Sequence, residues 1–190
     1  GNPFTFTGVA SVGTGLWTPV SGPGASVFGN SASAVSNVTV NTYGSYVFRW
    51  TETNGGCIDF DEVTVVFEEP AVAQAGAATA EECDLSINLS GVQSIGGSTA
   101  AWSVVAGNPA DITFSSATIF NPGATSTAYG AYTFRLTETN GVCVSTDDII
   151  VTYRQQPVAN AGGGGSVCGK DAGNPFTFTG VASVGTGLWT

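Results

Sequence analysis

Histidine and methionine are absent from this chain of 190 residues, and only four residues are basic. Without histidine, the chain can form no Ser–His or Cys–His nucleophile and no histidine metal site, so those classes of enzyme are excluded. The four basic residues stand against fourteen acidic ones, which gives a net charge of −10. Because a surface this acidic repels phosphate backbones, we expect no nucleic-acid partner.

Long apolar runs are also lacking, although hydrophobic residues make up 42% of the chain. No stretch approaches the roughly 20 apolar residues that span a bilayer, so we expect no membrane insertion. No amphipathic helical periodicity appears either, which argues against a helical fold. Since the chain has no Met, we expect any export signal to lie outside this segment.

Two levels of internal repetition organise the sequence. Residues 1–18 and 173–190 are the same eighteen letters, GNPFTFTGVASVGTGLWT, which predicts a parent protein with a period of 172 residues. Within that period, YGSYVFRWTETNGGC (43–57) matches YGAYTFRLTETNGVC (129–143) at an offset of 86. The period is therefore two diverged modules, A and B.

The repeats predict three segments. Residues 1–70 are module A without its first strand, residues 71–157 are a complete module B, and residues 158–190 begin the next module A. We expect the modules to break near Pro70 and Pro157, because proline fixes φ, cannot donate to a β-ladder and stiffens a linker.

Short stretches of alternating apolar and polar residues predict β-strands in both modules. Residues 132–137 and 46–51 alternate in this way, and each stretch leads to a hairpin signal, Asn140-Gly141 or Asn54-Gly55. Strands this short, within modules of about 86 residues, fit a seven-stranded Greek-key sandwich. The predicted fold class is all-β, as tandem immunoglobulin-like sandwich domains.

Four aromatic residues are the candidates for the centre of each core. Trp17 and Trp102 fall on the third strand, where such sandwiches bury an aromatic side chain. Tyr46 and Tyr132 follow a small-residue turn and resemble the tyrosine that opens the sixth strand. Burial of the tryptophans favours a structural module, whereas an exposed stripe of Trp or Tyr favours glycan binding.

Several motifs together carry a family resemblance. They are the AG pairs at 75–76 and 161–162, the cysteines at 83 and 168, GTGLWTPVSGPG (13–24) and the shared YxFRxTETNGxC block. These resemble the PKD-like, immunoglobulin-like repeats of giant Bacteroidota surface proteins, including the mobile adhesins of gliding motility exported by the type 9 system. The chain departs from that pattern at residues 77–78 and 163–164, where the family often has an acid. The resemblance implies a secreted cell-surface protein that acts in cell adhesion.

Acidic residues gather late in each module. A solvated acidic face that keeps a long polymer soluble is the first interpretation. The alternative is a calcium site at a module junction, since Ca²⁺ takes six to eight oxygen ligands. The weak candidates for metal ligands are Asp59, Asp61, Glu62, Asp147 and Asp148. We expect no other cofactor.

Four cysteines, two per module, indicate an oxidising compartment. With two cysteines in each module, the simplest disulfide joins Cys83 to Cys143 inside module B. In a standard sandwich, however, Cys83 ends the first strand and Cys143 follows a hairpin at the opposite end. A bond to an adjacent domain and free buried thiols therefore stay open as alternatives.

Two classes of function remain. The first is a structural repeat of a long secreted adhesin or extracellular filament, a semi-rigid spacer or polymer unit at the cell surface. Its partners are neighbouring repeats of the same chain and other copies in a filament, with any surface or glycan ligand outside this segment. The second is a carbohydrate-binding or accessory array of a secreted enzyme. No catalytic residue emerges in either case.

Overall fold

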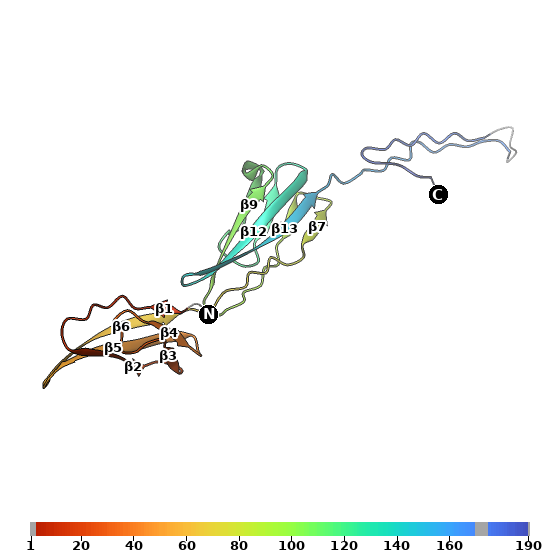
Figure 1. Ribbon diagram of the computed structural model, residues 1–190. Coiled ribbons are helices and arrows are strands. Elements are labelled where there is room, and N and C mark those ends of the chain that lie inside the picture. The colour runs from red at the N-terminus through yellow and green to blue at the C-terminus, as the bar shows by residue number, and fades with distance from the viewer. Residues whose placement is uncertain (1–2, 170–174, 190) are drawn as a thin grey trace. The chain divides into compact units, whose positions relative to one another are not determined.

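The computed structural model describes residues 3–169 and 175–189, and their regular structure is β-strand apart from one 3₁₀ turn (Figure 1). No helix of the described part is long and apolar enough to cross a membrane. Residues 1–2 of the first predicted segment, and residues 170–174 and 190 of the last, lie outside the described residues.

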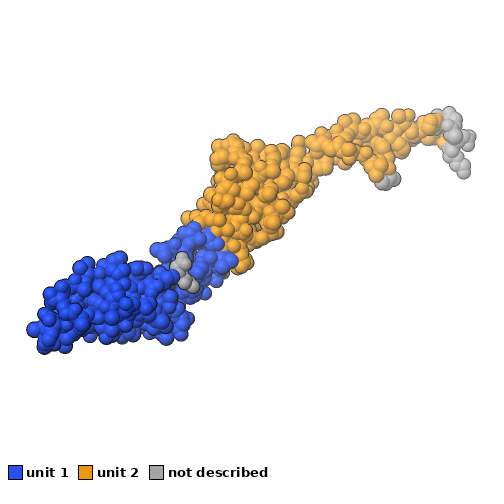
Figure 2. All heavy atoms as spheres, viewed as in Figure 1, with its two compact units in different colours: residues 1–72, 94–98, 138–145 blue, residues 73–93, 99–137, 146–190 orange. Residues whose placement is uncertain are grey.

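The chain divides into two compact units, shown in blue and orange in Figure 2. The first comprises residues 1–72, 94–98 and 138–145, and the second comprises residues 73–93, 99–137 and 146–190. The first boundary falls two residues beyond Pro70. Residues 158–190 are grouped with the second unit, so the start of a third module there stays a prediction.

The strands of module A form two antiparallel sheets. One has the order β1 (Phe4–Thr5), β4 (Asn37–Val40), β3 (Ser26–Phe28). The other has the order β2 (Thr14–Ser21), β5 (Gly44–Asn54), β6 (Cys57–Phe67). Among the described residues β6 is an edge strand, with β5 as its neighbour.

Module B has seven strands: six in the same arrangement as those of module A, and one more at the edge of its second sheet. Its three-stranded sheet runs β10 (Ile112–Phe114), β11 (Gly123–Ser126), β8 (Ser86–Asn88). Its four-stranded sheet runs β7 (Thr79–Glu82), β13 (Cys143–Tyr153), β12 (Gly130–Asn140), β9 (Thr99–Ala106), and the turn η1 (Pro109–Asp111) precedes β10. The chain changes sheet between β7 and β8, β8 and β9, β9 and β10, and β11 and β12. The predicted all-β, immunoglobulin-like Greek-key sandwich is confirmed.

Strand β7 shows at which end of β13 the chain enters module B. It pairs parallel with the end of β13, from Thr79 opposite Ile150 to Glu82 opposite Tyr153. Earlier in the chain, the backbone N–H of Ala75 donates to the Asp147 carboxylate, 2.8 Å away. The chain therefore enters the module beside the start of β13 and follows that strand to its end.

Both predicted hairpins form, with the turn placed one residue later than the Asn-Gly signal suggests. Asn54 is still paired in the ladder, opposite Cys57, so the turn residues are Gly55 and Gly56. Gly55 and its counterpart Gly141 have φ of 63° and 56°. This left-handed region favours glycine, because a Cβ atom there is strained.

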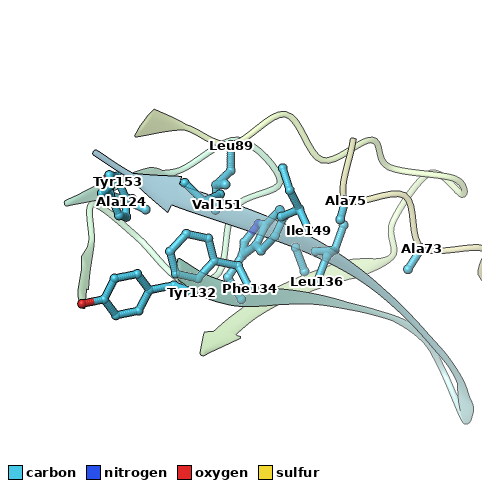
Figure 3. Packing of buried hydrophobic residues seen from close by; sticks show 12 residues of the cluster. Ala73, Ala75, Leu89, Ala124, Tyr132, Phe134, Leu136, Ile149, Val151 and Tyr153 are labelled. Atoms are coloured by element: carbon cyan, nitrogen blue, oxygen red, sulfur yellow. The ribbon is translucent and has the colours of Figure 1, made fainter. Parts of the chain in front are cut away.

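Side chains from both sheets of each module meet in its core. In module B, Phe134 and Leu136 of β12 lie with Val151 of β13 against Ala124 of the opposite sheet and Leu89, which directly follows β8 (Figure 3). The alternating sequence of β12 puts its apolar side chains on the face toward the core, since residues two apart along a strand point the same way.

A buried indole lies at the centre of each core. Trp17 and Trp102 are 6% and 4% exposed. The indole N–H of Trp17 donates to the carbonyl of Ala34 at 3.2 Å, and that of Trp102 donates to the carbonyl of Phe120 at 3.1 Å. The indole thus packs as an apolar group without leaving its polar N–H unpaired.

The two candidate tyrosines are buried and make equivalent hydrogen bonds. The Tyr46 hydroxyl donates to the carbonyl of Thr42 at 2.8 Å, and the Tyr132 hydroxyl lies 3.4 Å from that of Ala128. Tyr132 also donates to the Asp111 carboxylate at 2.9 Å. Each tyrosine ties the start of its strand to the loop four residues before it, as in the tyrosine corner of such sandwiches.

We expect Trp102→Ala to lower the free energy of unfolding of module B by about 3–5 kcal/mol, because it removes apolar contacts and leaves a cavity. Calorimetry of the whole chain measures this effect. The matched control is Val105→Ala on the same strand, where the side chain is 44% exposed, and its effect should stay within about 0.5 kcal/mol. A Trp102→Ala chain that melts like the wild type would show that the indole does not hold the core.

Candidate functional site

Two of the five candidate calcium ligands form ion pairs with arginines. Glu62 lies directly opposite Arg49 in the β5–β6 ladder and accepts from its Nε at 2.9 Å. Asp148 takes both Nε and Nη2 of Arg135, at 2.7 and 2.8 Å. The hydrogen bonds from Arg135 hold the pKa of Asp148 below its ordinary value. Both pairs are cross-strand ion pairs on a solvated face.

The other three candidates make local or backbone contacts. Asp59 and Asp61 each accept from the backbone N–H of the next residue, at 2.9 Å, and Asp147 accepts from that of Ala75. The part of the chain that the structure describes holds no group of three or more acidic, cysteine or histidine side chains able to bind a metal. The structure does not bring the calcium candidates together.

The predicted bond between Cys83 and Cys143 does not form, and both residues carry free thiols. Cys143 is the first residue of β13, whereas the pairing of Glu82 with Tyr153 places Cys83 at that strand's other end. At about 3.3 Å per residue the two cysteines lie roughly 33 Å apart along the strand. A disulfide requires Cα atoms within about 7 Å, so the prediction is wrong on geometry.

A buried carboxylate marks the entry end of module B. Glu138 continues the core face of β12 and is fully buried. Its Oε1 accepts from the backbone N–H of Ser94 at 2.9 Å and from the hydroxyl of Ser98 at 2.5 Å. Burial disfavours the charged form, but these hydrogen bonds outweigh it and lower the pKa of Glu138. The carboxylate therefore organises the loop between β8 and β9.

Module A carries the equivalent carboxylate, Glu52, in the shared TETN motif. Glu52 accepts from the backbone N–H of Ser11 at 2.9 Å, from the Ser11 hydroxyl, and from the indole N–H of Trp50 at 2.9 Å. These bonds, that from the Ser11 side chain above all, lower the pKa of Glu52 to about 2. Here too the carboxylate fixes the loop that precedes the tryptophan-bearing strand, which is β2 in module A.

Sequence reasoning missed these two glutamates, although a signal was present. The alternation of β5 and β12 runs on past the apolar residues and puts Glu52 and Glu138 on the core face. A charged residue on a buried face needs hydrogen-bond partners, and this requirement points to the loop that supplies them.

A groove of about 450 Å³ opens beside Glu52 in module A. Its lining includes Trp17, Trp50 and Val63. The corresponding residues of module B, at offsets of 85 and 86, are Trp102, Leu136 and Ile149. They share one core cluster with Ala73 and Ala75, which belong to the segment that leads into module B. In module B, the incoming linker therefore fills the place that the groove has in module A.

Comparisons with known proteins give distant structural matches only. No protein-family model and no curated protein matches the chain. An endo-fucoidan hydrolase of glycoside hydrolase family 107 is 12% identical, with a TM-score of 0.33, over 76% of this chain and 24% of its own. Drosophila N-cadherin EC1-3 is 9% identical, with a TM-score of 0.37, over 74% and 55%. A chimeric titin Z1Z2 tandem is 13% identical, with a TM-score of 0.33, over 75% and 82%.

The chain thus spans about a quarter and about half of the length of the first two of these structures. Similarity at this level carries no argument about fold, activity or ligand.

Because the folded pKa of Glu52 is about 2 and its ordinary value is 4.5, protonation favours the unfolded chain. Its contribution to the stability of module A is complete above about pH 4.5 and is lost as the pH falls toward 2. We expect Glu52→Gln to be less stable at neutral pH and to lose less stability over this interval, as measured by chemical unfolding at a series of pH values.

The matched variant is Ser11→Ala, which removes the hydroxyl donor but keeps the backbone N–H. It should flatten the pH dependence only in part. A Glu52→Gln chain with the full pH dependence of the wild type would show that this carboxylate does not couple to folding.

Proposed function

We propose that this chain is a structural repeat region of a long secreted protein at the cell surface, an adhesin or an extracellular filament. Its modules act as semi-rigid spacer units. Its partners are the neighbouring repeats of the same chain and, in a filament, other copies of it, and any surface or glycan ligand binds elsewhere in the parent protein.

The observation that carries the proposal is the repeat itself. Eighteen residues recur without a change after 172 residues, and the two modules between them have the same fold. A unique binding site gains nothing from such duplication, whereas length is proportional to the number of copies. The matched polar residues of the two modules also serve their own fold, as ion pairs and as loop-anchoring carboxylates.

The linker between the modules supports a semi-rigid unit. Ala73 and Ala75 are buried in the core of module B. The linker residues before them also make hydrogen bonds: Val72 donates its N–H to the Ser94 hydroxyl at 2.9 Å, and Glu69 accepts from the side chain of Asn140 at 2.9 Å. A segment with its side chains buried and its backbone bonded is not a free tether.

The glycan-binding alternative is not favoured. Carbohydrate readers of the kind considered above need aromatic faces in contact with solvent, and Trp17, Trp50 and Trp102 are 6%, 8% and 4% exposed.

The proposal is tested by deleting one 172-residue period in frame from the parent gene. We expect export and surface binding to persist, with a projection shorter by one period, because no single copy holds a unique site. Immunoelectron microscopy measures the length of the exported projection, and a surface-binding assay measures binding.

Deletion of residues 100–157 alone is the control. It cuts through β9 and removes the remaining strands of module B, so it should leave an unfolded segment and reduce export. Complete loss of binding after the deletion of a whole period would overturn the spacer proposal.

A further inference from the structure

The two cysteines of module B lie at opposite ends of the module. Cys143 begins β13, beside the end at which the chain enters. Cys83 directly follows β7, whose last residue pairs with Tyr153 at the end of β13. Cys57 occupies in module A the place of Cys143, as the first residue of β6. Cys168 corresponds to Cys83 in the repeat.

The first cysteine of a module lies beside the residue that follows its last strand. In module B that residue is Arg154, whose backbone N–H donates to the carbonyl of Glu82 at 2.7 Å, so Cys83 comes next to it. Glu68 is the matching residue of module A, since it directly follows β6. A first cysteine of module A would therefore lie beside Glu68.

The second cysteine of module B reaches the same place. The thiol of Cys143 lies 3.8 Å from the carbonyl oxygen of Glu68. Next to it, the side-chain amide of Asn140 donates to the carbonyl of Glu69 at 2.9 Å, so this hairpin tip is fixed against the residues that leave β6. By the repeat, the first cysteine of module A and Cys143 would therefore both lie beside Glu68, and the equivalent two cysteines would both lie beside Arg154 one module later.

We propose that a disulfide crosses each junction and joins the first cysteine of one module to the second cysteine of the next. Cys83 then pairs with Cys57 of the following period, and Cys168 pairs with Cys143 of the following period. The inference rests on the proposed array, because every bond requires a neighbouring module. It also accounts for the absence of a bond between Cys83 and Cys143.

Formation of the bond requires an oxidant, for which an exchangeable disulfide of the exported compartment suffices. One cysteine thiolate attacks that disulfide and forms a mixed disulfide, and the second cysteine then displaces the remaining sulfur. Two protein thiols are oxidised, one small disulfide is reduced to two thiols, and these carry the two protons. Oxidised glutathione serves as the probe.

The test compares this chain with a chain of two periods, made by placing residues 1–172 before residues 1–190. Both are folded in oxidised and reduced glutathione, alkylated, and digested with trypsin after denaturation. Cleavage after Arg135, Arg154 and Lys170 separates Cys143 (residues 136–154) from Cys168 (residues 155–170). We expect these two peptides to be disulfide-linked in the monomeric two-period chain and separate in the monomeric 190-residue chain.

The position of the bond is tested by two matched variants of the two-period chain. Cys143→Ser in the second copy should abolish the linked pair, whereas Cys143→Ser in the first copy should leave it intact. A Cys83–Cys143 bond, a linked pair that survives the second-copy change, or thiols that all stay reduced would overturn the proposal. Calorimetry of the same chains reports whether the added modules fold, which separates failure of the bond from failure of the array.

Discussion

Packing of one indole between two sheets is the interaction on which each module depends. The two sheets of a sandwich share no ladder, so side chains alone hold them together. In module A, the ring of Trp17 stacks on Phe6 at 4.1 Å and lies 5.3 Å from Trp50. Its N–H binds the loop before β4, so the same residue joins the sheets and fixes a connection between them. In module B, the indole N–H of the buried Trp102 likewise binds the loop before β11.

The sequence predicts this core because its signal is local. Alternation along residues 46–51 and 132–137 fixes which side chains point inward, and the Asn-Gly hairpins fix where those strands end. The disulfide and the calcium site are not local in this sense. Whether Cys83 meets Cys143 depends on which ends of the strands adjoin, and that follows only from the parallel pairing of β7 with β13. Asp148 is taken up by Arg135 on the neighbouring strand of its own hairpin, which leaves it unavailable to a calcium site.

Glu52 and Glu138 show a different limit. Their position on the core face could be read from the strand pattern, but their partners could not, because Ser11, Ser94 and Ser98 lie in loops some 40 residues away in the sequence. Such a carboxylate is tolerated only when the loop closes over it. The TETN motif therefore specifies a loop conformation as well as a strand.

Linker and core are continuous in this protein, and this continuity connects the fold with the proposed function. Ala73 and Ala75 belong to the segment between modules and also to the core of module B. An array built this way gains reach with each copy, while each copy keeps the same internal contacts.

The most direct test of the spacer account is the length of purified chains of one, two and four periods, measured by electron microscopy. The last strand of each module has 11 residues, or about 36 Å, so one period of two modules should add a constant ~70 Å. Straight particles whose length rises by that increment agree with the account. Lengths that do not rise in proportion to the number of periods, or beads on a loose string, would contradict it.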